Sequence, residues 1–386
     1  MNLKKVAVIT PGTFPIPSGS SSSVERVVEH VVSKAAQRID ARIYARLWNG
    51  QAEIDTVRGV PCVRIRASRA RMYVQAVIRS MAQFLPDTIQ IENRPRFVLP
   101  IKRSFPNAQI ILNLHSVTFM SRKHIPLKLL RSSLRAADRI FVNSRYLYRK
   151  VAAVCPSCAS RIVVNTLGVD QERFRSKWTE EGMQRSEAGK DMLGWADRKI
   201  ILYVGRLIPL KGVHHLLKAI PRVIARQPKA LFVIVGSAFY GSARRTVYVR
   251  KLERLGRVYP QHVRFVPYVS HEQIPDWYLL ADVVVMPSVE KEAFGLVNVE
   301  AMASGVPVLA TRVGGIQEVV ADGVTGVLVR PFRLSVRLAN ELNRLLDDDE
   351  RRKRMGEAAV EHVQNHFTWD KTAERWANEI GAPAEQ

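Results

Sequence analysis

Residues 282–310 constrain the fold more than any other stretch of this chain. The stretch begins with a short, β-branched apolar run, 282–286, bounded by a proline, which is typical of a buried parallel strand. After a loop, apolar residues recur at helical spacing from Gly295 onward, and Gly305 ends that helix. Residues 308–310 form the next expected strand. This order predicts an α/β unit whose loop lies at the carboxyl end of a strand, where open α/β sheets bind ligands.

Two carboxylates flank the start of that helix. Glu292 and Glu300 lie eight positions apart, which is roughly 12 Å along a helix. The paired carboxyls of glycosidases lie about 5–9.5 Å apart, so the spacing fits acid/base hydrolysis poorly. It fits a ligand held at both ends, with a phosphate between them at the N–H groups of Leu296 and Val297. A sugar hydroxyl at Glu292 and a ribose hydroxyl at Glu300 predict a sugar nucleotide.

The residues around these carboxylates carry a family resemblance. Residues 287–308 contain Pro-Ser, Glu-Ala-Phe-Gly and Glu-Ala-Met-Ala-Ser-Gly-Val-Pro-Val, and Gly-Gly followed by Glu lies at 314–318. This pattern resembles the retaining glycosyltransferases of family 4. The resemblance implies an α/β protein of the GT-B fold, with two Rossmann-like, doubly wound domains facing a central cleft. It also implies transfer of a sugar from a nucleotide donor to an acceptor hydroxyl, with retention at the anomeric carbon.

The expected domain boundaries follow from length and composition. A chain of 386 residues is long enough for two domains with their own cores. Residues 1–170 are expected to form the N-terminal, acceptor-side domain, and 199–365 the C-terminal domain that binds the nucleotide sugar. The polar segment 171–198 lacks periodic apolar residues and is expected to be a linker and entry segment. Residues 366–386 are expected to form a C-terminal helix that crosses back to the N-terminal domain.

The resemblance also assigns site residues. Arg206 and Lys211 follow the expected strand 200–204 and would face the donor pyrophosphate, the guanidinium as a fork and the ammonium as a point charge. His115 ends the expected strand 110–114, would face the cleft and would contact the sugar. The implied catalytic residues are Glu292, His115, Arg206 and Lys211. The implied donor-binding residues are Gly19, Gly205, Arg206, Lys211, Gly236, Pro267, Glu292, Phe294, Gly295, Leu296, Val297 and Glu300.

Two loops depart from the family pattern. The first loop normally carries paired glycines, but here Gly19 stands alone among Ser18 and Ser20 to Ser23. A β-carbon limits the close approach of backbone to a phosphate, so the catalytic geometry of this loop stays open. Pro267 stands where glycine is common near the nucleobase, so the base preference also stays open.

Metal and cofactor chemistry is not expected. Asp347, Asp348 and Asp349 contain an Asp-x-Asp pattern, but they lie between two expected helices, where capping explains them better. Cys155 and Cys158 form a C-x-x-C pattern without a second pair or nearby metal-spaced histidines, and are interpreted as loop thiols. The nucleotide sugar is then a co-substrate, and neither a metal nor another cofactor is required.

The charge distribution suggests a further partner. Of the net charge of +24, residues 1–170 contribute +18, from 27 basic and 9 acidic side chains. Such asymmetry favours a polyanion or an anionic membrane surface. Expected partners are a nucleotide sugar, an acceptor glycan or lipid-linked sugar and, peripherally, an anionic membrane, but not nucleic acid. The basic residues behind this expectation include Arg64, Arg66, Arg69, Arg71, Arg79, Arg94, Arg96, Lys102 and Arg103.

The expected location is the cytoplasm, with the inner membrane face or the spore as further options. No apolar run approaches the roughly 18 residues of a membrane span, and the first residues lead straight into a strand rather than a signal peptide.

Rival functions remain open from the sequence. A sugar-nucleotide epimerase or a phosphorylase could share the fold. Residues 91–95 (Ile-Glu-Asn-Arg-Pro) and 239–241 (Phe-Tyr-Gly) resemble the subset of the family associated with bacterial spore coats. A non-catalytic structural or polyanion-binding protein is therefore a second alternative, which the serine-filled first loop supports. The presence of Arg206, Lys211, Glu292 and Glu300 favours the transferase.

Overall fold

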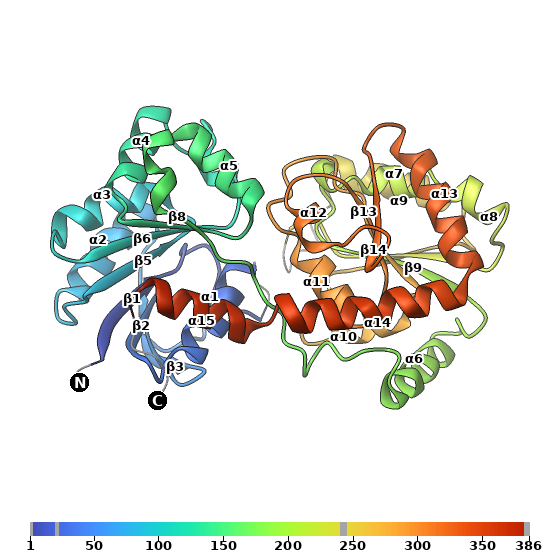
Figure 1. Ribbon diagram of the computed structural model, residues 1–386, viewed down its shortest axis with the longest axis horizontal. Helices are drawn as coiled ribbons and strands as arrows, with labels where there is room; N and C mark the ends of the chain where they lie inside the picture. Colours follow the sequence, from blue (N-terminus) through green and yellow to red (C-terminus); the bar gives the residue numbers. More distant parts are fainter. Residues whose placement is uncertain (1–2, 20–22, 240–244, 382–386) are drawn as a thin grey trace. The chain divides into compact units, whose positions relative to one another are not determined.

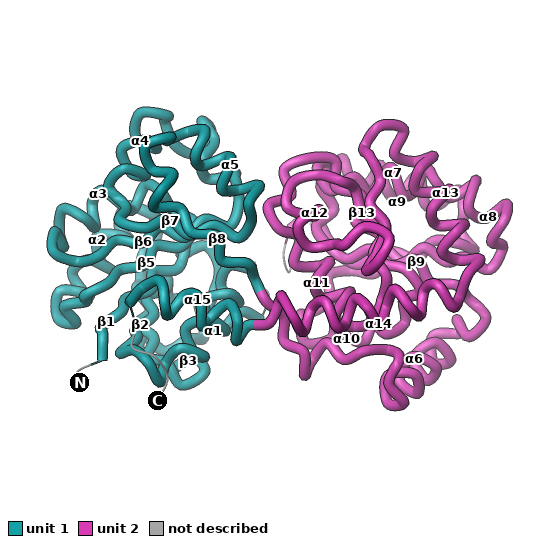
Figure 2. Tube along the Cα trace, in the orientation of Figure 1, with its two compact units in different colours: residues 1–167, 369–386 teal, residues 168–368 magenta. Residues whose placement is uncertain are grey.

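The computed structural model describes residues 3–19, 23–239 and 245–381, and the chain divides into two compact units (Figures 1 and 2). Unit 1 comprises residues 1–167 and 369–386, and unit 2 comprises residues 168–368. Each unit is built on one largely parallel sheet with helices packed against it. The predicted α/β class with two parallel-sheet domains is confirmed.

The sheet of unit 1 has eight strands in the order β3-β4-β2-β1-β5-β6-β7-β8. All neighbours are parallel except β3 and β4. The central strands read as apolar runs because helices cover both faces of a parallel sheet. The strands are β1 (Lys4–Ile9), β2 (Ile39–Arg46), β3 (Ile54–Val57), β4 (Val60–Ile65), β5 (Thr88–Glu92), β6 (Gln109–Leu114), β7 (Arg139–Val142) and β8 (Ile162–Val164).

The strand β3 was not predicted from the sequence. It pairs antiparallel with β4 through a two-residue turn at Arg58 and Gly59, both with positive φ, as a tight hairpin requires. Ile54 is 77% exposed, so the strand lacks the buried apolar run that marks the others.

The helices of unit 1 include the last one in the chain. Helix α1 buries Val27, Val28, Val31 and Val32. Helix α15 packs against α1, where the rings of His30 and Trp369 stack with centroids 5.0 Å apart. The helices are α1 (Ser23–Lys34), α2 (Ala70–Met81), α3 (Pro95–Ser104), α4 (Leu127–Ala136), α5 (Arg145–Val154) and α15 (Trp369–Glu379), with short 3₁₀ turns at Thr118–Met120 and Pro156–Arg161.

The sheet of unit 2 has six parallel strands in the order β11-β10-β9-β12-β13-β14. The strands are β9 (Lys199–Val204), β10 (Ala230–Val235), β11 (Val263–Val266), β12 (Val283–Met286), β13 (Val308–Thr311) and β14 (Gly326–Val329). The helices are α6 (Glu180–Met192), α7 (Val213–Leu217), α8 (Ile220–Ile224), α9 (Val247–Arg257), α10 (Ile274–Leu280), α11 (Leu296–Ala303), α12 (Ile316–Val319), α13 (Leu334–Asp347) and α14 (Asp349–His366), with a 3₁₀ turn at Pro209–Lys211.

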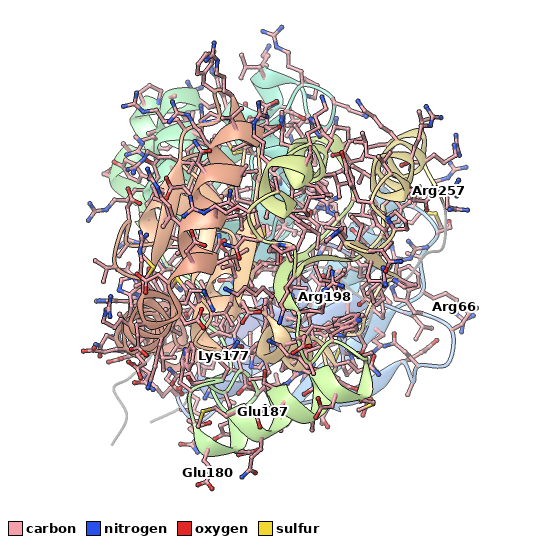
Figure 3. The ribbon with its side chains drawn as sticks, turned by 90° about the vertical axis from the view of Figure 1, so that its right-hand side faces the viewer. Arg66, Lys177, Glu180, Glu187, Arg198 and Arg257 are labelled. Atoms are coloured by element: carbon pink, nitrogen blue, oxygen red, sulfur yellow. A yellow bond between two sulfur atoms is a disulfide. The ribbon has the colours of Figure 1, made fainter. Side chains whose placement is uncertain are left out.

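The segment 171–198, expected to be a linker, contains α6 and belongs to unit 2. Helix α6 packs against α10, and Ser186 Oγ donates to the carbonyl oxygen of Leu279 at 2.7 Å. The exposed side chains Glu180 and Glu187 lie on α6, whereas Lys177, just before it, is buried (Figure 3). Periodicity did not predict this helix because most of its side chains are polar and exposed.

The two connections between the units are paired with each other. Val169, just after the first connection, forms a parallel bridge with Thr368, just before the second. The N–H of Val169 donates to the carbonyl oxygen of Phe367 at 2.9 Å. The Gly-Val-Asp sequence at 168–170 therefore lies where the chain enters unit 2.

The interpretation of Cys155 and Cys158 as free loop thiols is wrong. The structure joins them in a disulfide. Cys155 caps the end of α5 and the following 3₁₀ turn folds back, which brings the two Cα atoms to 5.4 Å, within the range that a disulfide spans. The sequence pattern alone did not reveal this turn.

Candidate functional site

The predicted donor residues Arg206, Lys211 and Glu292 lie on the loops after β9 and β12, where the strand order of the unit 2 sheet reverses. From β9 the chain proceeds outward to β10 and β11, and then returns to place β12 on the other side of β9. The loops after β9 and β12 therefore leave the carboxyl ends of neighbouring strands in opposite directions. Such switch points are where open α/β sheets bind ligands.

Lys211 and Glu292 meet across this switch point. Lys211 Nζ lies 2.5 Å from Glu292 Oε2, and Ser288 Oγ donates to the same oxygen at 3.1 Å. The backbones of the two loops are also joined, since the N–H of Val289 donates to the carbonyl oxygen of Leu210 at 3.0 Å. Both charged side chains are largely buried, with 19% and 15% of their surface exposed. The sequence placed Lys211 at the pyrophosphate and Glu292 at the sugar, but it did not predict their contact.

A pair of glycines supports the backbone of Glu292. The N–H of Gly315 donates to the carbonyl oxygen of Glu292 at 2.9 Å. A β-carbon on Gly314 would lie 1.9 Å from that same oxygen, and Gly314 has a φ of +58°. Only glycine fits this close approach. The Gly-Gly pair after β13 therefore fixes the position of the backbone at Glu292.

The loops after β9, β10 and β11 contact one another through their backbones. The N–H of Gly236 donates to the carbonyl oxygen of Val266 at 3.0 Å, and a β-carbon on Gly236 would lie 2.1 Å from the carbonyl oxygen of Gly205. Arg206 follows Gly205 and is exposed, and its carbonyl oxygen accepts from Tyr203 Oη at 2.9 Å. Pro267 directly follows β11 and is also exposed.

Helix α11 starts beside the Lys211–Glu292 pair. Gly295 precedes the helix, and Leu296 and Val297 form its first turn, whose N–H groups have no partner within the helix. Phe294 is buried and packs edge-on against Phe367, with ring centroids 5.8 Å apart. The partial positive charge of a helix start favours an anion here.

Glu300 lies on the same helix but in a different environment. Its carboxylate accepts from Tyr278 Oη at 3.0 Å and lies 3.2 Å from His271 Nε2. The residue is 4% exposed, whereas His271 is partly exposed. Phe174 packs against both rings. Glu292 and Glu300 therefore have separate partners, as expected if they hold separate parts of a ligand.

Two predicted site residues, His115 and Gly19, belong to unit 1. His115 follows β6, as predicted, and its Nε2 lies 2.6 Å from Glu92 Oε2 at the end of β5. Gly19 lies in the exposed part of the first loop. Its neighbours Ser20, Ser21 and Ser22 lie outside the described residues, as do Tyr240 and Gly241 of the spore-coat-like pattern.

The structure reveals residues that the sequence analysis did not select. Glu92 and Ser288 contact the predicted residues His115 and Glu292. In unit 1, Arg94 Nη2 donates to Thr13 Oγ1 at 2.5 Å and so joins the loops after β5 and β1, which flank the switch point of that sheet. Burial lowers the pKa of Arg94 to about 10. A signal was available for Glu92, because it is the single acidic residue of the buried strand β5 and stands at its carboxyl end.

Some residues from the sequence analysis have structural roles. Asp348 caps α14 by accepting from the N–H of Arg351 at 2.8 Å, so the capping interpretation is confirmed. The prediction that Arg64 helps to attract a membrane is wrong. Arg64 is buried and donates to the carbonyl oxygens of Ile16 and Ala52. Lys102 lies 3.1 Å from Asp138.

Within the described ranges, no three His, Cys, Asp or Glu residues group in a way that could hold a metal ion. None of the described helices is long and apolar enough to cross a membrane.

Comparison with known protein families gives a match for each half of the chain. Residues 24–173 match the family described as Glycosyltransferase Family 4, and residues 187–362 match Glycosyl transferases group 1. Spore coat protein SA of Bacillus subtilis is 30% identical over 370 residues, covering 96% of this chain and 97% of that protein. D-inositol 3-phosphate glycosyltransferase 2 of Catenulispora acidiphila is 37% identical over 247 residues, covering 62% of this chain and 54% of that protein.

Solved structures share the fold over nearly the whole chain. Sucrose-phosphate synthase from Thermosynechococcus elongatus superposes with a TM-score of 0.82 and 23% identity, covering 98% of both chains. HepE from Anabaena, solved in complex with UDP, superposes with a TM-score of 0.79 and 21% identity, covering 98% of this chain and 99% of that one.

Proposed function

Because this chain belongs to the glycosyltransferases of family 4, we propose that it transfers a sugar from a nucleoside diphosphate to an acceptor hydroxyl, with retention at the anomeric carbon. The observation that carries the proposal is the Lys211–Glu292 contact across the switch point of unit 2, beside the start of α11. A cation, a carboxylate and free helical N–H groups in one place are the groups that a sugar diphosphate needs.

In this proposal the main task of unit 2 is to stabilise the leaving diphosphate. Negative charge builds up on that group as its bond to the sugar breaks. Lys211 and the N–H groups of Leu296 and Val297 supply positive charge and dipoles that are in place before the reaction. Arg206 would add a second cation. Lys211 leaves the carboxylate of Glu292 for the phosphate or bridges both. Because Glu292 also accepts from Ser288, it keeps one donor if Lys211 moves.

The two carboxylates would then hold the two ends of the donor. Glu292, whose backbone is held by Gly314 and Gly315, accepts hydrogen bonds from hydroxyls of the sugar. Glu300 accepts a ribose hydroxyl at the oxygen next to His271, while Tyr278 holds the other oxygen. Among the residues of the site that the structure describes, no side chain is placed as an obvious nucleophile. The leaving phosphate would therefore help to deprotonate the acceptor on the same face of the sugar.

We further propose that the reaction needs no metal, because Arg206, Lys211 and the helix start supply the positive charge that a metal would otherwise provide. The acceptor would be a glycan or a lipid-linked sugar of the cell surface or spore coat. The protein would act in the cytoplasm, with peripheral attachment to an anionic membrane or to the spore.

The relative named as a spore coat protein favours a second candidate, a non-catalytic coat or polyanion-binding protein with the same fold. Product analysis separates the candidates. The purified chain is incubated in EDTA with radiolabelled UDP-, GDP- or ADP-sugars and an extract of lipid-linked and glycan acceptors. Transfer of label with retained configuration supports the proposal. An isomerised sugar nucleotide would identify an epimerase, and recovery of every donor unchanged would favour the coat protein.

A further inference from the structure

A chain of buried hydrogen bonds runs through unit 1 and ends at His115. Trp376 Nε1, on α15, lies 2.6 Å from Gln90 Oε1, and Gln90 Nε2 lies 2.5 Å from Glu92 Oε1. The second carboxylate oxygen, Glu92 Oε2, lies 2.6 Å from His115 Nε2. Glu92 is 0% exposed, so its carboxylate depends on these protein partners.

The chemistry of the donors fixes the direction of this chain. An indole N–H can only donate, so Gln90 must turn its amide oxygen to Trp376 and its NH₂ group to Glu92. Asn113 Nδ2 also donates to Glu92 Oε1, at 3.3 Å. One oxygen of Glu92 thus accepts from two amides. The carboxylate is an acceptor on both sides if the proton between Glu92 and His115 lies on His115 Nε2.

His115 is also held through its backbone. Its N–H donates to Asn93 Oδ1 at 3.3 Å, and its carbonyl oxygen accepts from Asn143 Nδ2 at 3.2 Å. Residues that follow β5 and β7 therefore fix the backbone of a residue that follows β6. The other ring nitrogen, Nδ1, is buried and has no hydrogen-bond partner among the described residues.

We propose that Glu92 is a positioning residue, which holds His115 in the tautomer with the proton on Nε2 and leaves Nδ1 to accept a hydrogen bond from a substrate hydroxyl. This inference rests on the proposed transferase function, since it assigns a sugar hydroxyl as the partner of Nδ1. A neutral imidazole has one donor and one acceptor nitrogen, so fixing the donor also fixes the acceptor. Gln90 and Trp376 act through Glu92, because they keep its carboxylate in place.

The substitution Glu92→Gln gives a sharp test because it should invert the tautomer. Gln90 and Asn113 both donate to the Oε1 position, so the single oxygen of a glutamine at position 92 should turn toward them. Its NH₂ group would then face His115 Nε2, which must become the acceptor, and the ring proton moves to Nδ1. The control is Asp87→Asn, which makes the same change of charge at the exposed, opposite end of β5.

Nitrogen NMR of the intact chain with ¹⁵N-histidine measures the tautomer without any substrate. The chain has nine histidines, and the signal of His115 is assigned by its loss in His115→Gln. We expect a slowly exchanging proton on Nε2 in the wild type and in Asp87→Asn, and a proton on Nδ1 in Glu92→Gln. A wild-type proton on Nδ1 overturns the proposal, and this measurement requires no Glu92 variant to fold.

Steady-state release of UDP from UDP-glucose then separates a positioning role from a structural one. We expect kcat to fall about tenfold or more in Glu92→Gln, with a smaller rise in KM for UDP-glucose, because unit 2 supplies most of the proposed donor contacts. Turnover equal to that of Asp87→Asn overturns the proposal. If the wild type transfers sugar from none of the UDP-, GDP- and ADP-sugars to the acceptor extract, the transferase function fails instead, and the NMR spectra alone then decide whether Glu92 positions the ring.

Discussion

At the scale of single residues, Glu292 is held from several sides and keeps part of its side chain exposed. Lys211 and Ser288 contact its carboxylate, and Gly315 holds its backbone. A partly exposed carboxylate suits a ligand that must enter and leave. Glu300 is different, because it is buried and accepts a hydrogen bond from Tyr278.

This difference predicts distinct kinetic effects for the two carboxylates. Glu292→Gln should lower kcat by about 10²-fold, because it removes charge next to the reacting sugar. Glu300→Gln should mainly raise the KM for the donor, because ribose binding is equally weakened before and during the reaction. Both are measured by steady-state release of nucleoside diphosphate. Small and equal effects of the two substitutions would contradict the assignment of the pair.

Another residue-scale feature is a buried lysine far from the proposed site in sequence. Lys177 lies 3.8 Å from Asp282 and donates to the carbonyl oxygen of Ala281. Burial lowers the pKa of Lys177 to about 8 from an ordinary value of 10.5. Burial alone would raise the pKa of Asp282. Lys177, Lys190 and the N–H of Ile200 together lower it by more, so the pKa of Asp282 lies below its ordinary value. The pair ties the segment before α6 to the start of β12.

Between pH 8 and 10.5 the unfolded chain keeps a proton on Lys177 that the folded chain has lost, so this residue makes stability rise with pH. Relative to Lys177→Met, the free energy of unfolding of the wild type should rise by roughly 2–3 kcal/mol over this range and stay constant below it. Urea unfolding at several pH values measures this difference. A difference that does not change with pH would show that the lysine is not desolvated.

At the scale of elements, the loops rather than the helices set the geometry of the site. The glycine pair after β13 determines where the loop of Glu292 lies, and the contact between Gly205 and Gly236 does the same for the loop of Arg206. These contacts join neighbouring strands at one edge of the sheet. A change in one loop should therefore reach the next.

Gly314→Ala tests this dependence, with Gly323→Ala as its control. Both glycines have a positive φ, but a β-carbon on Gly323 would meet nothing within 4 Å, whereas one on Gly314 would collide with Glu292. Backbone strain should cost both variants about 1 kcal/mol of stability, and the collision should cost Gly314→Ala more. Only Gly314→Ala should also weaken sugar-nucleotide binding, by about tenfold or more, as measured by calorimetry. Equal binding by the two variants would contradict a positioning role for the turn.

Local patterns in the sequence predicted most elements, but not the contacts between them. Apolar runs identified the buried strands β9, β12 and β13 because both faces of those strands are covered. They missed β3 and α6, whose side chains are mostly exposed. The same limit applied to the site. Each of Lys211 and Glu292 was predicted from its own motif, but their contact depends on the order of strands in the sheet, which no local pattern contains.

At the scale of the whole molecule, the surplus of positive charge belongs mainly to unit 1. Arg64 is buried, but Arg66, Arg69, Arg71, Arg79, Arg96 and Arg103 are exposed, and the side chain of Arg66 projects outward in Figure 3. A nucleotide sugar needs only a few cations, and those proposed for it lie in unit 2. This excess supports the proposed attraction to an anionic surface.

Vesicle binding tests the proposed attraction. Replacing Arg69, Arg71 and Arg79 with glutamine should weaken binding to anionic phosphatidylglycerol vesicles by about 1 kcal/mol per cation, and wild-type binding should fall steeply with added salt. The matched control replaces three exposed cations on α9 of unit 2, Lys251, Arg254 and Arg257. Equal losses from both sets, or equal binding to neutral vesicles, would contradict a membrane-facing unit 1.

The account depends most on the claim that the switch point of unit 2 binds a sugar nucleotide through Lys211. Calorimetric titration of the intact chain with UDP-glucose, GDP-mannose and ADP-glucose tests this claim directly. At least one of these should bind at a single site. Binding should be lost in Lys211→Met but kept in Lys229→Met. The second variant removes an exposed lysine just before β10, at the amino ends of the strands, opposite the proposed site. Failure of all three to bind the wild type, or equal binding by both variants, would contradict the account.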